Sequence, residues 1–66
     1  MTDYTTTEIT ALIHEYVHNE RNREILKRRL IDGRTYEQLA EEFDLSPRQV
    51  KNIVYKAEKI LFSKLH

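Results

Sequence analysis

Apolar residues recur at helical spacing along most of the chain, and no segment alternates convincingly with the two-residue period of a strand. The first apolar stripe is formed by Ile9, Leu12, Ile13, Tyr16 and Val17. The second stripe is formed by Ile25, Leu26 and Leu30. With the two further segments described below, this pattern predicts an all-α domain of four helices.

Residues with special backbone preferences stand where the first two helices should begin and end. Hydroxyl groups in the Thr5–Thr7 run can cap the first helix, and Asn19 is expected to break it. Gly33, the only glycine, is expected to end the second helix in a left-handed conformation. We expect residues 1–66 to form one domain, with residues 1–6 as a flexible leader.

Two capping boxes mark the starts of the third and fourth helices, because a hydroxyl residue is followed three positions later by glutamine. The boxes pair Thr35 with Gln38 and Ser46 with Gln49. Pro47 stands at the first helical position after the second cap, where its missing N–H group costs nothing. The fourth helix is therefore expected to run from Pro47 to about Lys64.

Residues 36–55 contain the third helix and the first turns of the fourth, which are joined by a short turn at Asp44 and Leu45. Two helices that cross at about 90–120° need a small residue at the crossing point, and Ala40 supplies it. The apolar residues that would fill the angle between the helices are Leu39, Phe43, Leu45, Val50 and Ile53. The segment predicts a helix-turn-helix that holds its second helix against a DNA groove, without a wing. An ordinary helical hairpin is the alternative.

The last helix has an apolar side and a basic, amide-bearing side when its residues are placed at 100° intervals. The apolar side carries Val50, Ile53, Val54, Ala57, Ile60 and Leu61. With residues 47–59 in a major groove, the predicted base contacts are Arg48, Gln49, Lys51 and Asn52. The predicted contacts to the DNA backbone are Ser46, Tyr55, Lys56, Lys59 and Arg28. A solvated helix face is the alternative for each of these residues.

Composition changes this interpretation little. The formal net charge is zero, but residues 46–66 hold five basic residues and one acidic residue, whereas residues 1–20 hold four acids and no Lys or Arg. A basic face matters more for nucleic acid than the total charge. The chain has no cysteine, which excludes disulfides and thiolate zinc sites. We expect a cytoplasmic protein that binds double-stranded DNA, needs no cofactor, does not enter a membrane and has no catalytic activity.

The stretch from Asn22 to Leu65 resembles region 4 of bacterial RNA polymerase sigma factors, which reads the −35 promoter element. The matching motifs are Arg23-Glu24-x-Leu26, Thr35-Tyr36-Glu37-Gln38-Leu39-Ala40-Glu41-x-Phe43, Val50-Lys51-Asn52-Ile53 and Ala57 with Leu61. The resemblance implies a helix-turn-helix fold, and it places the promoter-reading positions at Pro47, Arg48, Lys51 and Asn52. The LuxR-type regulator domain is similar in pattern, but Thr35 to Gln38 favour sigma.

Three positions depart from the pattern that this resemblance implies. Pro47 stands where the family usually has arginine, Arg48 where it often has glutamate, and Asn52 where glutamine is common. These differences predict a target other than the usual −35 sequence. No segment resembles the promoter-melting region of sigma factors, so we expect a free-standing, sigma-like transcription regulator of the kind that phages and mobile elements often encode. The alternative is a protein-interaction module that binds RNA polymerase with little DNA binding of its own.

Two features fall outside this interpretation. His14 and His18 fit the H-E-x-x-H spacing of a zinc site if the segment is helical. Since the apolar stripe explains the residues between them, we expect no metal centre, and incidental or regulatory metal binding is the alternative. Phe62 falls on the polar side of the last helix, where it is an isolated exposed aromatic residue or a contact for a second copy or a polymerase subunit.

Overall fold

The computed structural model describes residues 5–64, which form four α-helices in the order that the sequence predicts. The helices are α1 (Thr6–Tyr16), α2 (Glu20–Leu30), α3 (Tyr36–Phe43) and α4 (Pro47–Ser63). No strand occurs between residues 5 and 64, so this part of the chain carries no wing. None of the helices described is long and apolar enough to cross a bilayer.

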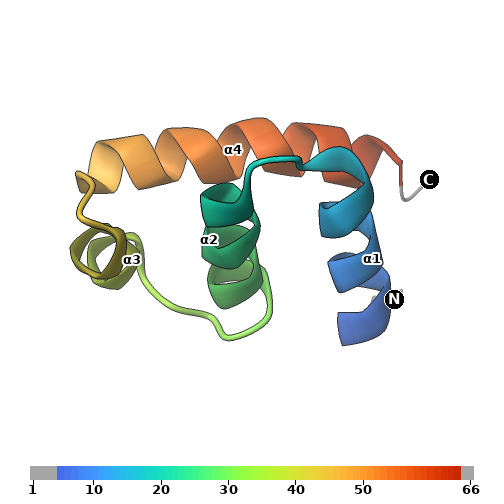
Figure 1. The fold of residues 1–66 in the computed structure, drawn as a ribbon, viewed down its shortest axis with the longest axis horizontal. Helices are drawn as coiled ribbons and strands as arrows, with labels where there is room; N and C mark the ends of the chain where they lie inside the picture. The colour runs from blue at the N-terminus through green and yellow to red at the C-terminus, as the bar shows by residue number, and fades with distance from the viewer. Residues whose placement is uncertain (1–4, 65–66) are drawn as a thin grey trace.

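The longest helix, α4, runs along one side of the domain, and the other three helices pack in a row beneath it (Figure 1). Its N-terminal end lies over α3, its middle over α2 and its C-terminal end over α1. Seventeen residues at 1.5 Å rise give α4 a length of about 26 Å, against 32 Å for the longest dimension of the domain. The opposite side of α4 is not covered by any of the helices described.

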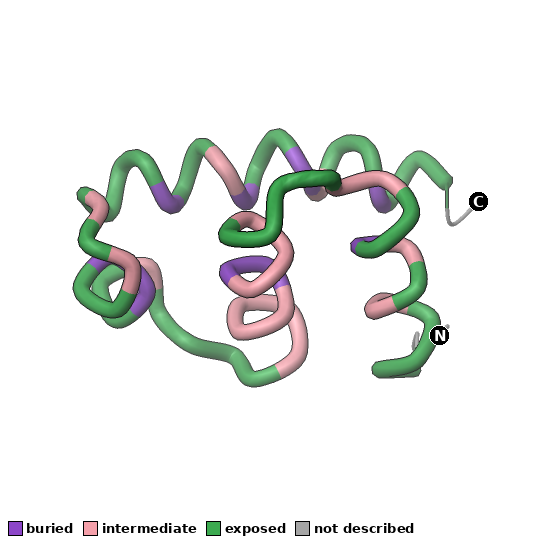
Figure 2. The backbone as a smooth tube through the Cα atoms, viewed as in Figure 1, coloured by how far each residue is buried: buried purple, intermediate pink, exposed green. Residues whose placement is uncertain are grey.

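One apolar cluster holds the four helices together, and no polar side chain of the described residues is buried. Its buried members are Ile13, Ile25, Leu26, Leu39, Ala40, Val50, Val54, Ala57 and Leu61. Figure 2 shows the buried positions of α4 on the side that faces the other helices, with exposed positions between them. The predicted crossing residue, Ala40, is 4% exposed, and the other apolar residues predicted between α3 and α4 are buried or half-buried.

Both predicted capping boxes are confirmed, and a third one begins α1. There the Thr5 hydroxyl accepts from the Glu8 N–H group, while the Glu8 carboxylate accepts from the Thr5 N–H and hydroxyl groups. These two hydrogen bonds to the charged form lower the pKa of Glu8. The predicted leader is therefore wrong for Thr5 and Thr6, which belong to the start of α1. Its first four residues lie outside the described part of the chain.

The connection between α1 and α2 is fixed by Arg23. Its guanidinium Nη2 donates to the His14 carbonyl oxygen at 2.8 Å, and Nε donates to the Val17 carbonyl oxygen. A positive charge at the C-terminal carbonyls of a helix is favourable because the helix dipole is negative there. The break predicted at Asn19 is confirmed, since Asn19 is the N-cap of α2 and accepts from the Asn22 N–H group at 3.0 Å.

Two residues in the left-handed region redirect the chain before and after α3. Gly33 has φ 73°, as the sequence predicts, although α2 ends three residues earlier at Leu30. Asp44 ends α3 with φ 56° and ψ 48°, and the next N–H group, that of Leu45, donates to the Ala40 carbonyl oxygen at 2.8 Å. The Asp44 conformation sets the direction in which α4 leaves α3.

We expect Asp44→Gly to be more stable than Asp44→Ala by about 1–2 kcal/mol, because only glycine adopts this conformation without a steric cost. Urea unfolding followed by circular dichroism measures the difference. At Glu41, an exposed position inside α3, the same pair of substitutions should rank in the opposite order by about 1 kcal/mol. Equal stability of the two Asp44 variants would contradict the role given to this turn.

One residue of the predicted apolar stripe does not join the core. Ile60 is 41% exposed, whereas Ala57 and Leu61 on the same helix are buried. Its place is at the edge of the stripe, over the connection between α1 and α2, which leaves its side chain open on one side. The prediction of Ile60 as a core residue is therefore wrong, and Ile60 becomes part of a groove described below.

Candidate nucleic-acid interface

The N-terminus of α4 is fixed by a capping box. The Ser46 hydroxyl accepts from the Gln49 N–H group at 3.1 Å, and the Gln49 amide oxygen accepts from the Ser46 N–H group at 2.8 Å. Pro47 occupies the first turn of the helix. The capping box and the proline together hold the first turns of α4 in one conformation, with the side chains that follow in fixed directions.

The polar side chains predicted on the outer face of α4 are all exposed. This set consists of Arg48, Gln49, Lys51, Asn52, Tyr55, Lys56 and Lys59. Two of the predicted contacts already have a structural role, because the Ser46 hydroxyl and the Gln49 amide oxygen form the capping box. The amide nitrogen of Gln49 is the group that this box leaves to donate a hydrogen bond.

The ion pairs of the described residues explain how a neutral chain presents a basic surface. All five lie on α2, α3 and the connection between them, and they join the acidic residues Glu20, Glu24 and Glu42 to Arg23, Lys27, Arg28 and Arg34. Between residues 5 and 64, no ion pair involves a basic residue of α4. The positive charges of α4 are therefore left uncompensated on its outer face.

Arg28 belongs to the contact between α2 and α3. Its Nε lies 2.9 Å from the Glu42 carboxylate and its Nη1 lies 3.0 Å from the Glu24 carboxylate. The guanidinium carbon also lies 5.1 Å from the centre of the Phe43 ring. A group held by two carboxylates and an aromatic ring is poorly placed to bind phosphate, so we assign Arg28 to the packing of the domain rather than to DNA.

Arg29 lies closer to the outer face of α4 than Arg28. Its guanidinium carbon is 4.3 Å from the centre of the Tyr36 ring, and the Lys51 ammonium is 5.7 Å from the same ring. Tyr55 meets Tyr36 edge to face with ring centres 6.2 Å apart. Desolvation by burial raises the pKa of Tyr36, and the positive charge of Arg29 opposes this rise. The ring of Tyr36 thus gathers two cations beside the first turns of α4.

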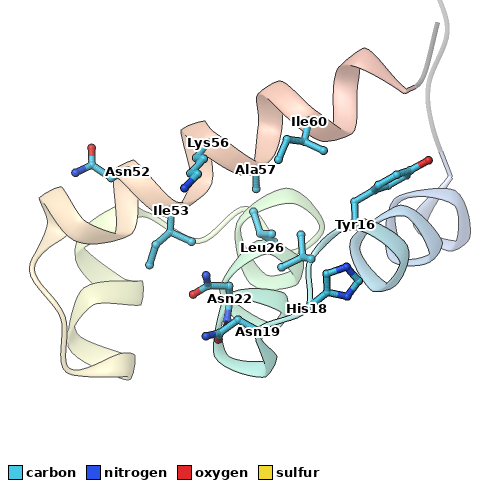
Figure 3. Close-up of a pocket in the computed structure, with 11 residues that line it drawn as sticks. Tyr16, His18, Asn19, Asn22, Leu26, Asn52, Ile53, Lys56, Ala57 and Ile60 are labelled. Atoms are coloured by element: carbon cyan, nitrogen blue, oxygen red, sulfur yellow. Dashed lines mark hydrogen bonds between the residues drawn. The ribbon is translucent and has the colours of Figure 1, made fainter.

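An open groove of about 360 Å³ borders the other side of α4 (Figure 3). One wall comes from the connection between α1 and α2, and the other from α4. The apolar part of its lining consists of Tyr16, Val17, Leu26, Ile53, Ala57 and Ile60. Figure 3 shows Lys56 extending from α4 toward the opposite wall, where His18, Asn19 and Asn22 supply polar groups. None of the described residues that line this groove carries a carboxylate.

His14 and His18 do not lie on one continuous helix. The first helix ends at Tyr16, and Val17 is extended with φ −116° and ψ 116°. His18 therefore does not lie one helical turn from His14, and the prediction of a helical H-E-x-x-H segment is wrong. The Arg23 guanidinium also donates to the His14 and Val17 carbonyl oxygens at the end of α1, and its positive charge disfavours a cation there.

Comparison with known proteins assigns the chain to a family. The family model described as sigma-70, region 4, matches residues 19–61, from the N-cap of α2 to the last turns of α4. The chain belongs to this family. Searches of the curated proteins and of the solved structures return no match.

Membership of the sigma-70 region 4 family confirms the resemblance seen in the sequence and the helix-turn-helix at α3 and α4. The family binds DNA and is not an enzyme family, and its partners are DNA and RNA polymerase. All of α1 lies before the matched residues. In this chain α1 completes the core through Ile13 and stands beneath the C-terminal end of α4.

Proposed function

We propose that this sigma-70 region 4 domain is a sequence-specific transcription regulator that places α4 in the major groove of DNA. The observation that carries the proposal is the uncompensated basic face of α4. Arg48, Lys51, Lys56 and Lys59 are exposed there, and the ion pairs of the described residues lie elsewhere. Helix-turn-helix proteins enter the groove with their second helix, which the first helix holds in place. Here α4 is the second helix and α3 is the first.

The first two turns of α4 carry the residues that we assign to bases. Arginine can donate two hydrogen bonds to O6 and N7 of guanine, and asparagine can pair with N6 and N7 of adenine. Arg48 and Asn52 are exposed, four positions apart on one helix, and so share a face. Lys51 lies beside them and the Gln49 amide nitrogen is free to donate, so both are included as base contacts.

The phosphates on the two sides of the groove would be met by two separate groups of side chains. On the side of α3, Arg29, Lys51 and Tyr55 surround the Tyr36 ring. On the other side, Lys56 extends over the groove next to α1 and α2. Since cations on both flanks fit a helix that lies between two phosphate backbones, we add Arg29 to the interface and leave out Arg28.

We expect Arg48→Ala and Asn52→Ala each to cost about 1–3 kcal/mol on a selected DNA site and to relax the preference at one base pair. Fluorescence anisotropy on the selected site and on single-base-pair variants of it measures both effects at fixed salt. Lys64→Ala is the control, because Lys64 is exposed and caps the far end of the same helix. If both interface variants bind every site as the wild type does, the base contacts are assigned to the wrong residues.

The apolar groove favours a second candidate function, in which the chain binds RNA polymerase with little DNA binding of its own. Its half-exposed Ile60 gives an apolar contact to a partner. Immobilised full chain would be incubated with purified RNA polymerase and, separately, with random DNA. Retention of polymerase by the wild type but not by Ile60→Glu, without enrichment of any DNA motif, would favour this candidate over the first.

A further inference from the structure

The C-terminal half of α4 carries a hollow whose described lining residues all belong to this helix. The hollow measures about 360 Å³ and is lined by Tyr55, Glu58, Lys59 and Phe62. The two aromatic residues at its ends are 51% and 42% exposed. No residue of α1, α2 or α3 contributes to its lining, so within residues 5–64 nothing covers this surface.

The spacing of these four residues identifies the kind of surface. They occupy positions i, i+3, i+4 and i+7 of one helix. Four residues at this spacing form the hole that receives a side chain from a facing helix in knobs-into-holes packing. Exposed aromatic rings at both ends of such a hole supply apolar area that a second helix would remove from water. The feature therefore fits a helix as its occupant.

We propose that the occupant is a second copy of this chain, with the two α4 helices antiparallel about a twofold axis between Glu58 and Lys59. In this arrangement Tyr55 lies opposite the partner's Phe62, and Glu58 lies opposite the partner's Lys59. A twofold interface requires that each contact occurs twice with the roles exchanged, and the order aromatic, acidic, basic, aromatic along the helix meets this requirement.

The charges select both the orientation and the partner. In a parallel pair about a twofold axis, Glu58 and Lys59 would each face their own counterpart, and like charges would repel. The antiparallel pair places opposite charges together at both central positions. A second copy supplies the opposite charges and the apolar rings that this surface requires, without any further requirement.

The pairing uses Tyr55 and Lys59, which are also assigned to phosphates and lie on the same side of α4 as Arg48 and Asn52. The dimer and DNA therefore compete for this face. Dimerisation measured without DNA tests the pairing separately from the proposed reading of bases. One helix from each copy gives an interface below the standard size of stable complexes. Self-association should therefore be weak and depend on concentration.

Sedimentation equilibrium of the full chain, over concentrations up to about 1 mM, tests the proposal with a charge exchange. Glu58→Lys and Lys59→Glu should each weaken dimerisation roughly tenfold, because each creates two repulsive pairs in the dimer. The double variant restores opposite charges across the axis and should dimerise like the wild type. Phe62→Ala should also weaken the dimer, and Glu41→Lys, with the same charge change on exposed α3, should not.

Circular dichroism would confirm that all variants keep the helical content of the wild type, since the changed side chains lie outside the buried core. A wild-type chain that remains monomeric over the whole concentration range would overturn the proposal. So would a double variant that dimerises as poorly as the two single variants, because the pairing across the axis would then be wrong.

Discussion

Leu39→Ala is expected to lower the free energy of unfolding by about 2–5 kcal/mol. Leu39 is completely buried, and α3 has only eight residues, of which Leu39 and Ala40 are the buried ones. Removing its side chain leaves a cavity where α3 meets the core, which a short helix with so few anchors cannot easily close. Because a domain of this size has a stability of only about 5 kcal/mol, this substitution should remove a large part of the free energy of unfolding.

Urea unfolding followed by circular dichroism measures this loss. Leu45→Ala is the matched control, because Leu45 lies in the turn after α3 and is only half-buried. It should cost clearly less than the Leu39 substitution. A loss below about 1 kcal/mol at Leu39, less than any Leu→Ala cavity in a packed core, would mean that α3 is not held through this residue.

Lys56→Ala combined with Lys59→Ala is expected to weaken binding to all DNA sequences and to flatten its dependence on salt. Each phosphate contact contributes about −0.9 to the slope of log K against log salt concentration. Loss of two contacts should therefore lower the slope by about 2. Between about 50 and 200 mM salt, the double variant should lose roughly tenfold less affinity than the wild type.

Anisotropy titrations at several salt concentrations, with a selected site and an unrelated duplex, give both slopes. Lys64→Ala removes one positive charge at the C-cap of the same helix, serves again as the control, and should keep the wild-type slope. Unchanged slopes in the double variant would remove Lys56 and Lys59 from the interface. A change confined to the selected site would instead assign them to bases.

The fold follows from local signals that agree with the global arrangement. The apolar stripes repeat at helical spacing, and the predicted capping boxes at Thr35 and Ser46 fix where α3 and α4 begin. Gly33 and Asp44 adopt the left-handed conformation that the sequence allows them. Each of these signals depends on residues only a few positions apart, so the helices and their ends can be predicted from the sequence alone.

The structure adds most where contacts between distant residues decide. Arg28 and Arg29 are neighbours in the same basic block, and only the packing of α2 on α3 places one beside Glu42 and the other over Tyr36. The end of α1 is held by Arg23, which belongs to the following helix and donates hydrogen bonds to carbonyl oxygens at the end of α1. Helical periodicity alone cannot give such positions, because it describes each helix by itself.

The sequence gives the net charge but leaves open how the charges are distributed over the surface. A neutral chain does not reveal which acidic residues meet which basic ones. In the described residues Glu24 and Glu42 each contact two basic side chains on α2, α3 or their connection, so these acids neutralise the basic block before α3. The basic residues of α4 then form the surface that distinguishes a DNA-binding domain from a neutral helical hairpin.

Selection from a random duplex library with the full chain tests most directly whether this face of α4 reads DNA. The wild type should enrich a short motif, and a variant with alanine at Arg48, Lys51 and Asn52 should enrich none while keeping its fold. Enrichment of the same motif by that variant would contradict the account, as would a folded wild-type chain that enriches no motif at low salt.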